Sequence, residues 1–282
     1  MEAFFGPAGN SESFKEKYRL FSDVPLYTAE MGLNAFEYQF GRGVRMTKSN
    51  AAVLKSECEK HGVEMSAHSP YYISLASEDE QKRLNSVRYM LETADAVKAM
   101  GGRRIVVHSG SVGKSSRPAA LSRAKDTLLL GIRALDEAGH SDITVCPETM
   151  GKIGQLGDLG EVMELCLLDE RIIPCIDFGH LNARTGGGIK GYEDYAAILN
   201  TIKNLLGSER LMVFHAHFSK IEYTKGGEKR HLTFADRVFG PDPVPLLKII
   251  AEQKLSPRII CESDGTQAED AAEMQEIYRS YL

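Results

Sequence analysis

The chain has 282 residues, of which 43% are hydrophobic and 26% are charged. These fractions are those of an ordinary globular protein, and the length is close to that of one α/β barrel, so we expect a single domain with a large core. No window reaches the roughly 18 apolar residues that a membrane span needs, and the N-terminus lacks a basic stretch followed by an apolar run. We therefore expect a cytoplasmic protein with no membrane partner.

The net charge of -5 argues at first sight against a nucleic-acid partner, because phosphates need a positive surface. However, this charge includes carboxylates that we interpret below as metal ligands. Three bound divalent cations would bring the total to about +1, so the charge of the metal-free chain does not exclude nucleic acid. The five cysteines include no Cys-x-x-Cys pair, and we expect them to be buried reduced thiols.

Strand-like and helix-like patterns alternate from one end of the chain to the other. Eight strands are predicted, at residues 3–6, 35–39, 64–68, 104–108, 143–148, 172–177, 211–217 and 258–262. Seven amphipathic helices are predicted, at residues 48–61, 78–100, 118–138, 159–168, 192–206, 243–253 and 268–281. Helix-start signals support three of them: Thr47, Ser77 with Glu80, and Asp158 with Glu161. This alternation predicts one parallel-stranded domain.

Residues that bind divalent metals recur where these strands stop. At or near the strand ends lie His68, His108, Glu148, Asp177, His215, His217 and Glu262, and in the loops that follow lie His180, Glu228 and His231. A (β/α)8 TIM barrel gathers the carboxyl ends of its strands into one site, whereas an open doubly wound sheet would concentrate its site near one switch point. The spread of these residues over nearly every strand favours the barrel.

Six of the eight histidines of the chain belong to this set. Zinc accepts imidazole nitrogen and carboxylate oxygen, and a cluster of two or three ions needs bridging carboxylates together with several histidines. Unpaired carboxylates crowded in one cleft would repel each other, which also favours bound cations. The glycine-rich loops lack the spacing of a dinucleotide or phosphate-binding fingerprint, so we expect no nucleotide cofactor.

Five segments resemble the endonuclease IV family of apurinic/apyrimidinic endonucleases, within the xylose-isomerase-like TIM barrels, and the similarity runs over essentially the whole chain. The matching segments are residues 68–77, 107–111, 147–149, 175–183 and 261–263. The resemblance implies three zinc ions at the mouth of the barrel. The first would be held by His68, His108 and Glu148, the second by Glu148, Asp177, Glu262 and a histidine of strand seven, and the third by His180 and His231.

The chain departs from the family pattern in three places. Lys229 stands where the family has an aspartate ligand of the third ion, and Glu228 is the obvious substitute. The segment with His215 and His217 replaces a single family histidine; alignment on the following lysine favours His215, but strand alternation puts His217 on the same face, so both are candidates. The loop that begins with Gly151 and Lys152 also differs from the family sequence.

The resemblance implies hydrolysis of a DNA phosphodiester on the 5′ side of an abasic site, as in base excision repair. Glu148 and Glu262 would be the catalytic residues, and the metals would be two to three Zn²⁺ per chain, with Mn²⁺ a possible substitute. An abasic nucleotide must leave the helix to reach a barrel mouth. Candidates for contact with the DNA are Arg42, Tyr71, Tyr72 and Lys152, and the enzyme is expected to be a monomer.

A sugar isomerase or epimerase on the same scaffold is the alternative function. Such an enzyme uses one or two metals and a pair of carboxylates for proton transfer next to a carbonyl, and the fold alone does not separate it from an endonuclease. The group formed by His180, Glu228 and His231 does separate them, because a sugar isomerase does not need it.

Overall fold

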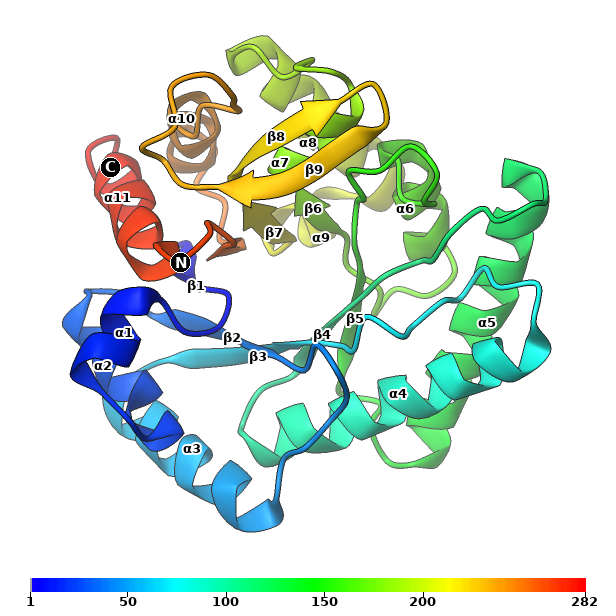
Figure 1. Cartoon of the computed structure of the whole chain (residues 1–282), viewed down its shortest axis with the longest axis horizontal. Coiled ribbons are helices and arrows are strands. Elements are labelled where there is room, and N and C mark those ends of the chain that lie inside the picture. The colour runs from blue at the N-terminus through cyan, green and yellow to red at the C-terminus, as the bar shows by residue number, and fades with distance from the viewer. Residues whose placement is uncertain (1) are drawn as a thin grey trace.

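A computed structural model describes residues 2–282 as a closed barrel of eight parallel strands surrounded by helices (Figure 1). One four-stranded sheet has the order β1-β10-β7-β6 and the other has the order β2-β3-β4-β5. These strands are β1 (Phe4–Pro7), β2 (Ala35–Gln39), β3 (Glu64–His68), β4 (Arg104–Val107), β5 (Thr144–Pro147), β6 (Cys175–Asp177), β7 (His215–Phe218) and β10 (Arg258–Cys261).

Short parallel bridges join the two sheets at both seams. Ala8 bridges to Glu37 between β1 and β2, while Val145–Ile172 and Glu148–Cys175 bridges connect β5 to β6. The ladder pairs within each sheet are parallel as well. The predicted TIM barrel is therefore confirmed, and all eight carboxyl ends lie at the same end of the barrel.

The predicted helices form the outer layer of the barrel. They are α3 (Lys48–His61), α4 (Glu80–Ala99), α5 (Arg117–Glu137), α6 (Leu159–Cys166), α8 (Tyr192–Leu206), α10 (Val244–Glu252) and α11 (Gln267–Arg279). Thr47 and Asp158 cap α3 and α6 as the sequence predicts. The start of α4 differs from the prediction, since Asp79 rather than Ser77 accepts the backbone hydrogen bonds from Gln81 and Lys82.

Several short elements were not expected from the sequence. They are α1 (Glu12–Lys17), a 3₁₀ turn at Phe21–Asp23, α2 (Val24–Glu30), α7 (Phe178–Arg184), α9 (Ser208–Met212), β8 (Lys220–Thr224) and β9 (Gly227–Leu232). Strands β8 and β9 form an antiparallel hairpin, drawn in gold in Figure 1, which lies apart from the two barrel sheets. The predicted strand at 211–217 begins only at His215, because α9 takes up its first residues.

The interior of the barrel differs from its helix layer in polarity. Apolar side chains such as Met90, Leu128 and Phe214 fill the main core and are fully buried. The barrel interior instead holds buried polar groups, including Glu37, Ser66 and His215, where branched aliphatic side chains are usual. All five cysteines are free and buried, as expected.

Within residues 2–282, no helix is both long enough and apolar enough to cross a lipid bilayer.

Candidate metal centre

Glu148, which directly follows β5, lies at the centre of a ring of histidines. Its Oε2 is 2.9 Å from His108 Nε2 and 3.2 Å from His68 Nε2. Its Oε1 is 3.2 Å from His217 Nδ1 and 3.3 Å from His180 Nδ1. One buried carboxylate therefore faces four imidazoles, with two on each oxygen.

Three sets of donor atoms at the barrel mouth are each compact enough to hold one ion, with all atoms of a set within 4.8 Å of one another. We call them the first, second and third groups. The first comprises His68, His108 and Glu148, the second Glu148, Asp177, His217 and Glu262, and the third His180, Glu228 and His231. Since Glu148 belongs to both the first and the second group, it is placed to bridge two ions.

The parallel strands bring these residues together. His68 and Asp177 are the last residues of β3 and β6, and His108 and Glu262 directly follow β4 and β10. His180 is placed by α7, whose N-cap is Asp177: the carboxylate of Asp177 accepts a hydrogen bond from the backbone N–H of His180 at 2.7 Å. A single Asp-Phe-Gly-His segment thus contributes to two groups.

The structure separates the two histidines of β7. His217 Nδ1 lies beside Glu148 and is 3.5 Å from Glu262 Oε1, whereas His215 Nε2 lies 3.0 Å from Glu37 and belongs to no group at the mouth. Alignment on the lysine had favoured His215, and the geometry instead favours His217 as the ligand of the second group.

The buried carboxyl and imidazole groups at the mouth shift one another's pKa values. Burial opposes ionisation of Glu148, but the facing His217 and His108 outweigh it and hold the pKa of this carboxyl well below its usual range. Burial raises the pKa of Asp177 to about 6. Burial would lower the pKa of His180, but Asp177 and Glu148 outweigh that effect and raise it to about 10.

The donor set fits divalent metal ions. Asp177 Oδ2 is buried and makes no hydrogen bond among the described residues, although it lies 3.0 Å from His180 Nδ1, and a buried carboxylate oxygen without a hydrogen bond is costly. His68 Nδ1 lies 2.8 Å from the carbonyl of Ser69, which leaves Nε2 directed at Glu148. Such a backbone contact is how proteins orient a metal-binding imidazole.

The third group depends on a close approach between the loop at Gly151 and the start of strand β9. Glu228 Oε2 lies 3.4 Å from His180 Nε2, and the Glu228 backbone N–H donates to the carbonyl of Gly151 at 3.1 Å. The Gly151 carbonyl also sits where a Cβ at Gly227 would be, and Gly227 has φ +91°. The two sequence departures, at 151 and at 228, are therefore in contact with each other.

Replacing Gly151 with alanine should disable the third group. An added Cβ would lie 2.6 Å from Glu228 Cβ and 3.0 Å from His180 Cδ2, so Glu228 would be displaced. The matched control is Gly154→Ala, where a Cβ meets nothing within 4 Å. We expect Gly151→Ala to bind one fewer ion per chain than Gly154→Ala in a Zn²⁺ titration of the chelator-treated protein; equal binding by the two variants would contradict this role of the loop contact.

Metal binding should weaken as the pH falls. In the metal-free state the raised pKa of His180 means that this imidazole carries a proton at neutral pH, which an ion must displace. The affinity should therefore rise with pH up to about 10, by about tenfold per pH unit for each proton displaced. Calorimetry in buffers of different ionisation enthalpy would measure the released protons, and an affinity that is independent of pH would contradict the assignment.

A cavity of about 660 Å³ opens over the three groups. Hairpin residues Glu228, Lys229, Arg230 and His231 form part of its lining, as do Tyr71 and Lys152. The ring of Tyr71 stacks on that of His108, with centroids 6.0 Å apart, while more than half of the Tyr71 surface stays exposed. Two of the predicted DNA contacts lie elsewhere, since Arg42 and Tyr72 line separate hollows.

Three other basic residues near the mouth stabilise loops. Arg117 pairs with Glu161 at 2.7 Å, Arg184 donates to the carbonyl of Lys152 at 2.8 Å, and Lys220 donates to the carbonyl of Asp236 at 2.6 Å. Lys152, Lys229 and Arg230 instead line the cavity.

One buried group, Glu37 on β2, was not predicted from the sequence. Its carboxylate is fully buried and lies 3.0 Å from both His215 Nε2 and His217 Nε2. Burial would raise the pKa of Glu37, but His217 and His215 outweigh it and hold the pKa well below its usual range. The sequence did carry a signal for Glu37, which stands between two aromatic residues in an apolar strand. Because side chains alternate along a strand, Glu37 must point to the opposite face from its aromatic neighbours.

The fold and the site together define a TIM barrel with clustered candidate metal ligands at the carboxyl ends of its strands. A family model described as a xylose isomerase-like TIM barrel matches residues 26–281, and the chain belongs to that family. The resemblance to endonuclease IV inferred from the motifs is confirmed, and the modest identities given below mark a divergent relative.

Two relatives and two solved structures illustrate the similarity. An uncharacterized protein of Methanocaldococcus jannaschii is 36% identical over 261 residues, which cover 92% of this chain and 91% of that protein. A probable endonuclease 4 of Thermotoga petrophila is 26% identical over 275 residues, 92% of each chain. A D-tagatose 3-epimerase-like protein superposes with a TM-score of 0.73 at 19% identity, covering 99% of this chain and 97% of the other. Endonuclease IV from Thermus thermophilus gives a TM-score of 0.71 at 19% identity, covering 99% of this chain and 98% of the other.

Proposed function

We propose that the protein is a metal-dependent endonuclease that hydrolyses the DNA phosphodiester on the 5′ side of an abasic site. The observation that carries the proposal is the third group, in which Glu228 supplies the carboxylate that Lys229 cannot. Similarity to probable endonuclease 4 proteins over most of the chain supports the same reaction. A sugar isomerase would need only the first two groups.

The mouth residues would hold two to three Zn²⁺ ions, since imidazole and carboxylate donors suit zinc, and the same donors accept Mn²⁺. The ions would supply Lewis acidity toward the phosphate and lower the pKa of the attacking water. Glu148 and Glu262 are the proposed catalytic carboxylates, with Glu262 Oε1 3.5 Å from His217 Nδ1 and Oε2 4.0 Å from His231 Nδ1. Glu262 thus lies between the second and third groups, where the attacked phosphorus and the leaving 3′ oxygen would be.

The rim of the cavity offers suitable contacts for DNA. Lys152, Lys229 and Arg230 are basic residues of the cavity lining, and Lys229 and Arg230 are both held by Glu222, at 2.5 and 2.7 Å. Such charges can contact phosphates beside the flipped nucleotide. Tyr71 is exposed beside His68 and His108, and its ring would fill the space of a missing base. Arg42 and Tyr72 would act farther along the DNA.

A substrate panel tests the proposal against its rival. The metal-loaded protein is incubated with a duplex that carries one abasic site, with an intact duplex, and with a ketohexose. We expect a nick in the first duplex alone. Epimerisation of the sugar without nicking would support the isomerase function, and the D-tagatose 3-epimerase-like neighbour makes a ketohexose the appropriate competitor.

A further inference from the structure

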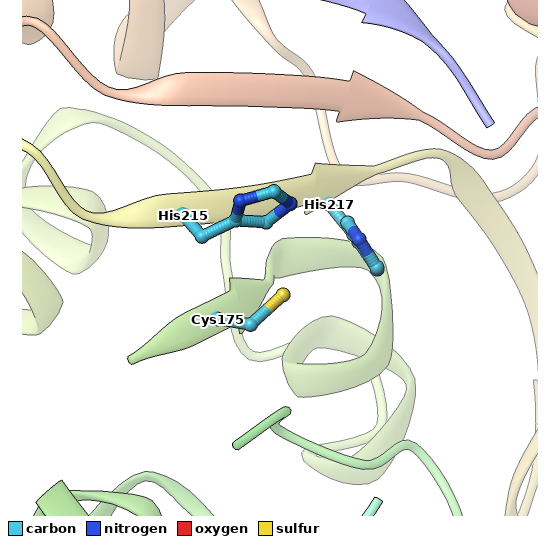
Figure 2. Close-up of side chains that lie close together, drawn as sticks. All are labelled: Cys175, His215 and His217. Carbon is cyan, nitrogen blue, oxygen red and sulfur yellow. The ribbon is translucent and has the colours of Figure 1, made fainter. Parts of the chain in front are cut away.

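A second set of metal donors lies inside the barrel, below the mouth. Cys175, His215 and His217 offer donor atoms within 4.8 Å of one another, and all three side chains are buried. Figure 2 shows Cys175 on β6 with its sulfur pointing toward the neighbouring β7, which carries both histidines. Cys175 and His215 are the first residues of their strands and pair in register, so they lie one layer deeper than Asp177 and His217. Together with Glu37 we call these residues the deep cluster.

The ring nitrogens of the deep cluster are short of hydrogen bonds. Neither ring nitrogen of His215 has a hydrogen-bond partner among the residues described, and the same holds for Nε2 of His217. His215 Nε2 and His217 Nε2 each lie 3.0 Å from an oxygen of Glu37, but the ring N–H directions do not meet hydrogen-bond geometry. Buried polar atoms in native proteins are nearly always satisfied, so these orphaned nitrogens, two of which face the Glu37 carboxylate, point to a missing partner.

The missing partner has the chemistry of a cation. Two donor atoms that share one ion sit near each other without pointing at each other, because both point at the ion. Tetrahedral zinc with bonds of about 2.0 to 2.3 Å places its donors roughly 3.3 to 3.8 Å apart. The N···O separations of 3.0 Å in the deep cluster are shorter than this range, so the Glu37 carboxylate must move slightly away from the two imidazoles when an ion binds. Ser66 Oγ donates to Glu37 Oε2 at 3.0 Å and so orients the carboxylate from outside the cluster.

We propose that the deep cluster is a further metal site, in which Cys175, His215, His217 and Glu37 bind one Zn²⁺ ion. A thiolate and a carboxylate neutralise the charge of the ion, which lowers the cost of burying it, and the sulfur donor excludes hard cations such as Mg²⁺ and Ca²⁺. Binding displaces the thiol proton of Cys175, which is released to solvent. It also displaces the Nε2 proton of His217, whose other ring nitrogen faces Glu148 at the mouth.

His217 thus joins the deep site to the second group. Its Nδ1 faces the mouth and its Nε2 faces Glu37, so with an ion on each nitrogen the ring would release its protons to solvent and bridge the two ions as an imidazolate. The deep ion lies outside the cavity that admits substrate, since none of its four residues lines that cavity. Its role is structural: it holds β2, β6 and β7 together beneath the reacting groups. The proposal of a deep metal site therefore does not depend on which reaction the residues at the mouth catalyse.

X-ray absorption at the zinc edge of the protein as purified tests the deep site without any substitution. The donors of the three mouth groups are all nitrogen and oxygen, so only the deep site gives a sulfur shell, at about 2.3 Å. In the cobalt-substituted protein the same thiolate should give a near-ultraviolet charge-transfer band. A zinc-loaded protein with neither the sulfur shell nor the cobalt band would overturn the proposal.

Cysteine variants assign the signal to a residue. Cys175→Ser should lose the charge-transfer band and bind one fewer ion per chain, whereas Cys166→Ser, at a fully buried cysteine of α6 outside the cluster, should keep both. A band that persists in Cys175→Ser would refute the assignment. Abasic-site nicking is measured on the same samples: nicking without a sulfur shell would reject only the deep site, and a sulfur shell without nicking would reject only the proposed function.

Discussion

Glu148→Gln should lower abasic-site nicking by about 10³-fold or more while leaving the barrel folded. The carboxylate is the only donor shared by the first and second groups, and its two oxygens face four histidines. An amide offers one neutral oxygen and an N–H₂ that cannot bridge two ions, so metal affinity and the stabilisation of the reacting phosphate fall together. Nicking rates and metal content are measured on the same preparation, with circular dichroism for the fold.

The matched control for this substitution is Glu161→Gln. Glu161 is also a buried glutamate, but it pairs with Arg117 in the capping box of α6, away from the candidate ligands. This variant should lose some stability and keep its metal content. A Glu148→Gln protein that binds as many ions as the wild type and nicks at a comparable rate would remove Glu148 from the centre of the site.

Glu228→Gln should remove one ion per chain and lower nicking by about 10² to 10³-fold, the usual loss when one electrostatic stabiliser of a transition state is removed. Glu228 is the only carboxylate of the third group, and the neighbouring Lys229 is engaged with Glu222. The first and second groups share no residue with the third, so they should keep their ions. Metal analysis after dialysis, together with single-turnover nicking, measures both effects.

Glu222→Gln is the control for Glu228, because it changes a glutamate of the same hairpin that belongs to none of the donor groups in the described chain. Its metal content should equal that of the wild type. If Glu228→Gln retained full metal content and full nicking, the third group would have no part in the reaction. The endonuclease proposal would then lose the observation that carries it.

The sequence predicted the barrel strands best where the alternation of apolar residues was clear. The predicted strands at 35–39 and 64–68 coincide with β2 and β3. The predicted strand at 172–177 was too long, because β6 begins only at Cys175. Pro174 has no N–H to donate to a neighbouring strand, and Ile172 makes only an isolated bridge. The apolar run 211–214 reads equally well as buried helix or strand, and the short helix α9 occupies its first part.

The hairpin β8–β9 gave almost no signal in the sequence. Its strands carry exposed or half-exposed charged residues such as Lys229 and Arg230 on a ribbon that packs over the mouth, so neither face shows a clean apolar alternation. The third group was predicted from the family motif and the residue types alone. The contact of Glu228 with Gly151 could not be foreseen, because it joins strand β9 to a loop that is distant in sequence.

The candidate ligands were easier to predict than their partners. Strand ends place His68, His108 and Asp177 at the mouth of any such barrel, whatever the details of packing. The choice between His215 and His217 needed the interior geometry, since both face the same side of β7 and only the depth of each residue separates them. Glu37 was missed for the same reason: its importance lies in what it faces across the barrel.

The central claim is tested most directly by incubating the metal-loaded protein with an end-labelled duplex that contains one abasic site, with and without a chelator. We expect a single nick immediately 5′ to the abasic site, which leaves a 3′ hydroxyl and disappears when the ions are removed. An intact duplex after prolonged incubation, with a protein shown by metal analysis to hold its ions, would contradict it.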